Sequence, residues 1–304
     1  MYLKIDLSEE GGIRMSHYLA NKKIALLGGD DRERTLLTTL HDKKAQLQVL
    51  GQPGCNCDVE VVKSLAELDN EVDAVIAPMT GVDKDYKIKK RFVDKEIYLS
   101  EDFFSRLAAG TKFFIGFAKP KLKRWCEKYD LVLIELAALD ELAILNAIPT
   151  AEGAINEAIM HSQLTLHNNN SFVLGLGRVG MTLARMLKGM GSNTFGVARK
   201  PKDLARALEM GLEPVKFENL RQNIAQADFI FNTVPFLVLD RETLAKVNSD
   251  AVIIDIASAP GGTDFEAAED LGISAHLALG LPGKVAPKSA GKILGDIIPR
   301  FIEE

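Results

Sequence analysis

The sequence predicts an α/β protein with two Rossmann-like domains, each a doubly wound parallel sheet, joined by a hinge helix. Three observations predict this fold. Short apolar runs alternate with amphipathic stretches along the chain, as strands alternate with crossover helices in parallel sheets. A glycine motif, Gly175-Leu-Gly-Arg-Val-Gly180, follows one buried run and opens a helical stretch. The length of 304 residues, 47% of them hydrophobic, is sufficient for two domains.

The first domain is predicted over residues 22–145, after an arm over residues 1–21 that we expect to be loosely ordered. Its strands are predicted from apolar runs bounded by turn residues, at 24–27, 46–50, 59–62, 74–77, 112–115 and 132–134. A helix is predicted from Arg32 to Leu40, after the turn Gly28-Gly-Asp30. This turn lacks a third glycine, and its acidic residues would repel a phosphate. We therefore interpret the domain as a substrate domain, with the aspartate capping the helix.

A hinge helix and linker are predicted over residues 146–168. Residues 140–161 are strongly helical except at Pro149, where we expect the helix to restart with Thr150 as its cap. Polar residues at a domain junction are well placed to meet a ligand. Glu152 is a minor candidate for acid–base catalysis; a carboxylate near a helix start is more often a partner of the helix dipole.

The second domain is predicted over residues 169–304, with the option that its C-terminal helix packs back on the first domain. Its strands are expected at 172–174, 194–198, 214–217, 228–235, 251–258 and 275–279. Helices are expected at 203–210 and 218–225, and a last helix ends near Phe301. Within the glycine motif, Gly175 allows the sharp turn, Gly177 allows a pyrophosphate to approach, and Gly180 allows close packing of helix on strand.

The residues after the second strand of this domain favour NADP over NAD as the cofactor. Arg199 lies 22 positions beyond Gly177, where NAD enzymes usually carry an acidic residue that binds the ribose. A cation there suits a 2′-phosphate. The alternative is that Arg199, Lys200 and Lys202 form a solvated loop. The predicted cofactor-binding residues are Gly175, Gly177, Arg178, Val179, Gly180, Arg199, Lys200, Thr233, Val234 and Pro235.

Two later loops also lie at the predicted ligand edge of this sheet. The first follows Asp255 and carries Ser258; we expect Asp255 to order it by accepting backbone N–H groups. The second runs from Gly280 to Gly291 and opens the last helix, where Lys288, Ser289 and the first-turn N–H groups are candidates to hold a carboxylate. The alternative for this second loop is a rigid connector whose lysines, Lys284 and Lys288, face solvent.

Composition excludes several classes of protein. A net charge of −5 and a pI of about 5.7 argue against nucleic-acid binding. No apolar run approaches the ~20 residues that span a bilayer and no signal-peptide pattern opens the chain, so a cytoplasmic protein without membrane contact is expected. Cys55, Cys57 and Cys126 are an odd number in a chain with no sign of secretion, so we expect neither a structural disulfide nor a metal site.

Five blocks of sequence together resemble the A subunits of dipicolinate synthase, the sporulation enzyme that makes pyridine-2,6-dicarboxylate. The glycine motif is shared with many dehydrogenases, whereas the segments around Pro149, Pro260 and Pro282 are more specific. The arm before Lys23 departs from the family pattern. The blocks are Gly28–Arg32, Asn146–Gly153, Leu174–Arg185, Ala257–Phe265 and Gly280–Gly291.

The resemblance implies a two-domain enzyme that oxidises a dihydrodipicolinate-level intermediate of the lysine pathway in the mother cell of a sporulating bacterium. It also implies a flavoprotein-like partner, the B subunit of the synthase; a homo-oligomer is left open. A dicarboxylate needs cations or helix ends, and the proton needs an acceptor. The candidate substrate-binding residues are Arg32, Asn146, Thr150, Ser258, Lys284, Lys288 and Ser289. The candidate catalytic residues are Glu152, Lys288 and His276.

Two other functions stay open on the sequence alone. A two-domain 2-hydroxyacid or amino-acid dehydrogenase has a similar build, with a His or Lys base beside a substrate-binding Arg. A regulatory NADP-binding subunit would leave the chemistry to another chain.

Overall fold

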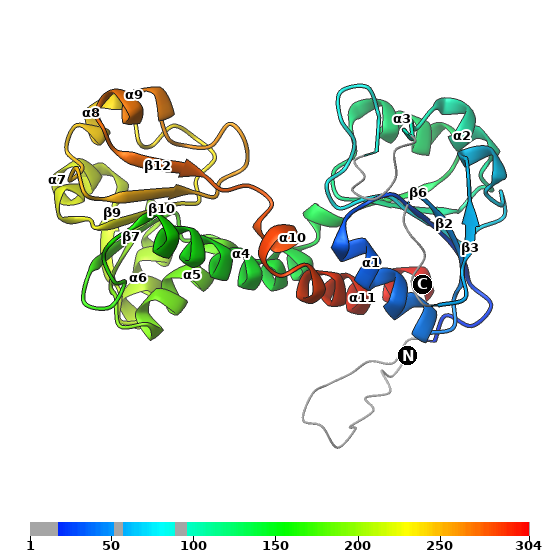
Figure 1. Cartoon of the computed structure of the whole chain (residues 1–304), viewed down its shortest axis with the longest axis horizontal. Coiled ribbons are helices and arrows are strands. Elements are labelled where there is room, and N and C mark those ends of the chain that lie inside the picture. Colours follow the sequence, from blue (N-terminus) through cyan, green and yellow to red (C-terminus); the bar gives the residue numbers. More distant parts are fainter. Residues whose placement is uncertain (1–17, 52–56, 89–95, 304) are drawn as a thin grey trace, which may run out of the picture. The chain divides into compact units, whose positions relative to one another are not determined.

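The structure is a computed structural model that describes residues 18–51, 57–88 and 96–303. The chain divides into two compact units (Figure 1). The first unit comprises the chain up to Leu142 together with the last helix, from Pro287 onward; the second runs from Ala143 to Ala286. Each unit contains one six-stranded sheet whose neighbouring strands are all parallel, which confirms the predicted fold class.

The sheet of the first unit has the strand order β3-β2-β1-β4-β5-β6, so the direction of winding reverses between β1 and β4. Ligands of such sheets bind outside the carboxyl ends of the strands, at this reversal. The strands are β1 (Lys23–Leu27), β2 (Gln46–Leu50), β3 (Glu60–Val62), β4 (Ala74–Ile76), β5 (Lys112–Ile115) and β6 (Val132–Glu135).

Helices pack on this sheet because successive strand residues point to opposite faces. Phe104 and Leu122, from two helices, join Phe113 in a buried cluster on one face. Ala25 and Leu27 of β1 belong to the same cluster. Ile24 and Leu26 alternate with them along the strand and are also fully buried. The helices are α1 (Asp31–Asp42), α2 (Glu101–Arg106), α3 (Pro120–Lys128) and α11 (Pro287–Glu303), with 3₁₀ turns η1 (Leu65–Glu67) and η2 (Leu136–Ala138).

The last helix packs against α1 through two glycines. A Cβ atom on Gly291 would lie 2.5 Å from the carbonyl oxygen of Arg32, and one on Gly295 would lie 2.6 Å from Cγ2 of Thr39. Backbone approach this close needs residues without side chains. Residues 287–304 therefore belong to the first unit, and their assignment to the second domain is wrong; packing back on the first domain was the option that the sequence left.

The sheet of the second unit has the order β12-β11-β10-β7-β8-β9, which repeats the topology of the first. Its winding reverses between β7, which precedes the glycine motif, and β10. The strands are β7 (Asn170–Leu174), β8 (Asn193–Ala198), β9 (Glu213–Lys216), β10 (Phe229–Asn232), β11 (Val252–Asp255) and β12 (Ser274–Leu277).

Two buried clusters cover the two faces of this sheet. Val173 and Phe231 pack with Leu183 of α5, whereas Phe172 and Ile230 pack on the opposite face with Leu220. The helices are α4 (Asp140–His161), which begins in the first unit, α5 (Arg178–Gly189), α6 (Pro201–Glu209), α7 (Leu220–Asn223), α8 (Arg241–Leu244), α9 (Phe265–Asp270) and α10 (Leu281–Val285). Two 3₁₀ turns, η3 (Phe217–Asn219) and η4 (Ile224–Gln226), flank α7.

Helix α4 runs without a break through Pro149, where the sequence predicted a restart. Proline removes one backbone donor from a helix. The hydroxyl of the next residue, Thr150, donates to the carbonyl of Asn146, one turn earlier, at 2.7 Å, so Thr150 bonds within the helix rather than capping it. Glu152 consequently lies in the middle of a helix that begins at Asp140.

Part of the predicted arm belongs to the fold. Leu19 is fully buried, and its N–H donates to the Lys43 carbonyl at 2.7 Å, so residues 18–21 are held by the end of α1. Residues 1–17 lie outside the described residues. The helix predicted over 218–225 is instead split into η3, α7 and η4, because the segment is short enough for 3₁₀ turns to compete.

The expectation that no cysteine forms a disulfide is wrong at Cys57, which is disulfide-bonded. Composition does not reveal which thiols a loop brings together. Cys55 lies outside the described residues. Cys126 is free and buried, and burial raises the pKa of its thiol to about 12, so it is not poised as a nucleophile. None of the described helices has the length and apolar composition needed to cross a membrane.

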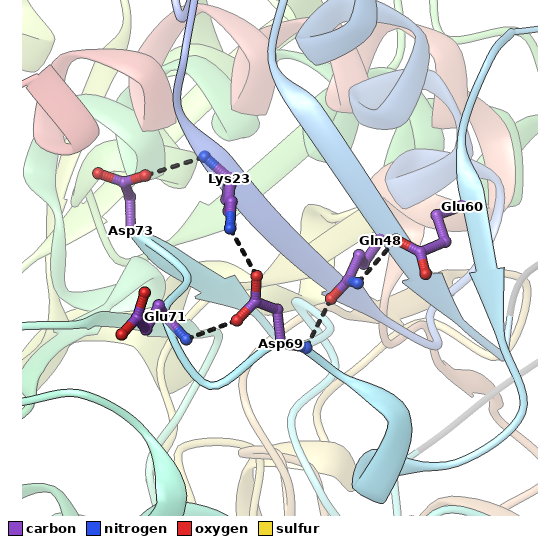
Figure 2. Close-up of polar contacts among 6 residues, drawn as sticks. All are labelled: Lys23, Gln48, Glu60, Asp69, Glu71 and Asp73. Carbon is purple, nitrogen blue, oxygen red and sulfur yellow. Dashed lines mark hydrogen bonds and ion pairs between the residues drawn. The ribbon is translucent and has the colours of Figure 1, made fainter.

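A polar network ties the amino ends of strands in the first unit (Figure 2). The Lys23 ammonium donates to Asp69 at 2.6 Å, and the Lys23 N–H donates to Asp73 at 2.9 Å. Gln48 joins Asp69 to Glu60 across the sheet. The network lies at the opposite end of the strands from the ligand edge, so we interpret it as structural. Its ion pair between Lys23 and Asp69 is partly exposed, so solvent screens it and it adds little to the stability of the sheet.

Candidate functional site

The three glycines of the motif do three different things in the structure. Gly175 has φ +89°, a conformation that disfavours other residues. A Cβ on Gly180 would lie 1.9 Å from the Gly175 carbonyl oxygen, so only glycine lets α5 approach the turn. A Cβ on Gly177 would meet nothing within 4 Å. Open space at Gly177, directly before the N–H groups of α5, is where a pyrophosphate would approach.

Thr233 braces this turn from the end of the neighbouring strand. Its hydroxyl lies 2.9 Å from the Leu174 carbonyl oxygen and 3.2 Å from that of Gly175. The hydroxyl therefore bonds to the backbone that shapes the turn. Thr233 therefore helps to fix the position of Gly175.

A cleft of about 660 Å³ opens beside the glycine turn. Its walls come from the turn, from the loop after β8, from the end of β9 and from the loop after β10. The lining residues are Gly175, Leu176, Gly177, Arg178, Ala198, Arg199, Lys200, Lys202, Asp203, Phe217, Val234, Phe236 and Val238. Six of the ten predicted cofactor residues line it. Val179, Gly180, Thr233 and Pro235 lie in the flanking backbone segments.

The cleft is strongly basic. Four cationic side chains line it, against the single carboxylate of Asp203. Arg199 is exposed, and among the described residues it makes no ion pair. Helix α6 begins at Pro201, which has no N–H, and the Asp203 N–H already donates to the Lys200 carbonyl at 3.0 Å, so the basic side chains determine the charge of this wall. A polyanion is therefore the ligand class that this cleft suits.

Sequence reasoning missed the apolar part of the lining. Phe217, Phe236 and Val238 line the cleft but are not charged and belong to no motif. Phe217 follows β9 directly, at the carboxyl edge of the sheet where ligands bind, so the sequence could have indicated it as a lining residue. Phe236 and Val238 lie beyond the predicted strand end, in a loop whose path the sequence does not show.

The corresponding turn of the first unit is closed by its own carboxylate. Glu33 is 1% exposed and accepts N–H groups of Asp30 and Met79 at 2.8 and 2.9 Å. Burial and, next, the carboxylate of Asp30 raise the pKa of Glu33. A Cβ on Gly29 would lie 2.6 Å from the Glu33 side chain, so no space remains for a phosphate. The Glu33 carboxylate thus accepts a backbone N–H of the turn that a phosphate would otherwise need.

Arg32, a candidate for binding substrate, already has a carboxylate partner. Its guanidinium is bonded twice to Asp30, at 3.0 and 2.8 Å, and the residue is 7% exposed. Burial by itself would raise the pKa of Asp30, but the hydrogen bonds from Arg32 outweigh it and the pKa is lowered. Asp30 also caps α1 as predicted. Arg32 therefore serves the turn, and a role toward substrate would require breaking a buried pair.

The other candidate residues are divided between the units. Lys288 and Ser289 lie exposed in the first turn of α11, in the first unit. Glu152, Ser258 and Lys284 are exposed in the second unit. Asn146 lies on α4, and its side-chain oxygen is buried without a partner among the described residues. Among those residues, no group of three or more His, Cys, Asp and Glu side chains could hold a metal ion.

His276 lies in the middle of β12 and not at the carboxyl edge. Its ring stacks on that of His161, with ring centroids 3.6 Å apart, and its Nε2 lies 2.9 Å from the Ser274 hydroxyl. Burial and the neighbouring His161 lower the pKa of His276, while Glu157 opposes this. Neither histidine lines the cleft.

This stack predicts a pH-dependent stability. Because the folded pKa of His276 is below its ordinary value near 6.5, its contribution is complete above pH 6.5 and is lost as the pH falls through the folded pKa. His276→Phe keeps a ring and removes the charge. We expect its melting temperature to fall less between pH 8 and pH 5 than that of the wild type. An equal fall in melting temperature in the variant and the wild type would show that His276 does not cause the pH dependence of stability.

Two family models match different parts of the chain. Residues 23–137 match the family model described as the N-terminal domain of the dipicolinate synthase A subunit. Residues 142–261 match the model described as the NAD binding domain of D-isomer specific 2-hydroxyacid dehydrogenases. The second match covers the glycine turn and every residue that lines the cleft.

Two relatives match over almost the whole chain, one of them both by sequence and by crystal structure. The A subunit of dipicolinate synthase from Bacillus subtilis is 34% identical over 294 residues, which are 94% of this chain and 97% of the relative. A crystal structure of the same subunit from Bacillus halodurans matches with a TM-score of 0.90 and 38% identity, covering 94% of this chain and 99% of that one. The crystal structure of the Bacillus subtilis protein matches with a TM-score of 0.89 and 35% identity, covering 94% and 97%. Since sequence and fold agree over both units, the chain belongs to the family of dipicolinate synthase A subunits.

Proposed function

We propose that this chain is the NADP-linked oxidoreductase subunit of a dipicolinate synthase, which oxidises a dihydrodipicolinate-level intermediate to pyridine-2,6-dicarboxylate. Membership in the family of dipicolinate synthase A subunits supports dipicolinate as the product. The observation that carries the cofactor assignment is the cleft in which the open Gly177 and the exposed Arg199 lie together. When bound there, the nicotinamide would accept a hydride from the substrate. The protein residues would bind the substrate and the cofactor, orient them, and take up a proton.

The wall at the end of β8 supports NADP over NAD. An NAD site usually places a carboxylate at this position to bind the ribose hydroxyls. Here Ala198 ends the strand, and Arg199 and Lys200 follow it along the cleft. We propose that Arg199 and Lys200 bind the 2′-phosphate. Asp203, in the first turn of α6, opposes them with one negative charge.

Arg199→Asp tests this assignment. We expect NADP to bind about 10- to 100-fold more weakly, because a charge-assisted hydrogen bond contributes roughly 1.5–3 kcal/mol, and NAD to be far less affected. Isothermal titration with each cofactor measures this. Arg206→Asp is the matched control, since Arg206 is exposed on α6 but does not line the cleft. Equal losses for NADP and NAD in Arg199→Asp would contradict the assignment.

One substrate carboxylate is proposed to bind at the start of α11. Lys288 is exposed in the first turn of a 17-residue helix whose early N–H groups favour anions. Ser289, Lys284, Ser258, Thr150 and Asn146 stay proposed as further substrate contacts. Glu152 and Lys288 stay proposed for proton transfer; the position of His276 in its stack favours it less.

Lys288→Met is expected to raise KM for the dicarboxylate about tenfold while the affinity for NADP is unchanged, because the change removes the charge and keeps the aliphatic stem. Steady-state kinetics and a cofactor titration measure the two quantities. Lys292→Met, one turn further along α11 and also exposed, is the control. Equal kinetics in both variants and the wild type would show that the start of α11 is a connector.

A single assay separates this function from its alternatives. NADP reduction and product absorbance are followed on freshly prepared dihydrodipicolinate, with and without the proposed B subunit. Activity only with the B subunit would favour a regulatory role for this chain. Because the second unit matches the 2-hydroxyacid dehydrogenase model, 2-hydroxy acids and amino acids serve as competing substrates. Turnover of those alone would replace the proposed reaction. The family membership supports a cytoplasmic site of action in a sporulating mother cell.

A further inference from the structure

Gly262 lies beneath the loop that forms one wall of the cleft. A Cβ at this position would lie 2.4 Å from the Val234 carbonyl oxygen and 2.5 Å from that of Phe236. The Gly262 carbonyl in turn accepts the N–H groups of Val238 and Leu239 at 2.9 and 3.0 Å. The backbone from Val234 to Leu239 therefore wraps around this glycine, with no room for a side chain.

Asp255, at the end of β11, fixes the position of Gly262 through a hydrogen bond. The carboxylate is fully buried and accepts the Gly262 N–H at 2.8 Å, the Thr263 hydroxyl at 2.7 Å and the Ala257 N–H at 3.0 Å. This confirms the prediction that Asp255 orders the loop after it. Three donors to one buried carboxylate leave that loop little freedom.

Asn232, the neighbour of Asp255 across the sheet, fixes the other end of the same wall. Its side chain is fully buried and bonds to both polar groups of Val234, accepting the N–H and donating to the carbonyl at 3.0 Å each. Val234, Phe236 and Val238 line the same cleft as Arg199. The wall is thus held by two buried side chains, Asn232 and Asp255, on adjacent strands.

We propose that Asp255 and Gly262 are positioning residues that hold the 234–238 wall in the conformation that binds the adenosine half of the cofactor. This rests on the proposed function. Because the 234–238 wall is already ordered before the cofactor binds, binding does not have to order it. Losing this order therefore weakens the affinity for the cofactor. The acidic group and the glycine act through the wall and do not contact the ligand.

Gly262→Ala and Asp255→Asn test the proposal, with NADP⁺ and adenosine 2′,5′-bisphosphate as probes in titrations of the full chain. Gly262→Ala must displace the wall. Asp255→Asn keeps the size of the side chain, but its amide can accept on only one side, so either Ala257 or Gly262 loses its acceptor. We expect both probes to bind about tenfold more weakly to each variant.

Gly191→Ala is the matched control, because it also adds one methyl group to the second unit. Gly191 has φ +81°, and its Cβ would lie 2.2 Å from the His167 ring, at the edge of the sheet opposite the cleft. It should lower the melting temperature and leave both affinities unchanged. Should Gly262→Ala not fold, Asp255→Asn decides by itself. Wild-type affinity in a folded Asp255→Asn variant would overturn the proposal. A wild-type chain that binds no NADP⁺ would instead contradict the proposed function, and this inference with it.

Discussion

Gly177→Val is expected to reduce the affinity for NADP at least about 100-fold while the fold survives. Gly177 has φ −82°, which any residue adopts, and an added Cβ atom would meet nothing within 4 Å beyond the neighbouring residues. A branched side chain would instead occupy the space in which the pyrophosphate approaches the first N–H groups of α5. Titration with NADP and thermal unfolding followed by circular dichroism measure the two quantities.

Gly180→Ala is the contrasting variant within the same motif. Its Cβ would lie 1.9 Å from the Gly175 carbonyl oxygen, so α5 must shift away from the turn. We expect a loss of stability of about 1–3 kcal/mol, as for other overpacked contacts. If Gly177→Val bound NADP as the wild type does, the motif would serve only to pack a helix on a strand, and the cofactor site would have to lie elsewhere.

Glu33→Ala is expected to destabilise the first unit by about 2–4 kcal/mol. The change leaves the buried N–H groups of Asp30 and Met79 without an acceptor, and each unsatisfied group costs roughly 1–3 kcal/mol. Trp125, the single tryptophan of the chain, lies in α3 of that unit. Urea unfolding followed by tryptophan fluorescence therefore reports on the first unit.

Two further variants separate burial from hydrogen bonding at Glu33. Glu33→Gln can accept on only one side of its amide, so about half of the loss is expected. Glu67→Ala removes an exposed carboxylate that also accepts a backbone N–H, from Lys63 at 2.9 Å, and should cost well under about 1 kcal/mol. Equal losses in Glu33→Ala and Glu67→Ala would show that the closed turn does not hold the unit together.

The glycine turn was predictable because its signals are local. Strand, turn and helix follow from apolar spacing and from the three glycines, and the distance from Gly177 to Arg199 follows from the length of one β-α-β unit. The six strands of each unit lie where the apolar runs predicted them, within a few residues at their ends. The continuous helix through Pro149 shows the limit of this approach, since local propensity is a weak guide once a helix packs against a core.

The sequence by itself determined the two parallel sheets, the glycine turn and the basic residues after β8, because periodicity, spacing and the need for positive φ act over a few residues. Tertiary structure alone decided that α11 packs on α1, that Arg32 binds Asp30, that Glu33 closes the first turn and that His276 stacks on His161. Each of these depends on which side chains meet in space. The same holds for the support of the cleft wall by Asp255 and Gly262, because the folded sheet brings the loops after β10 and β11 together at one edge.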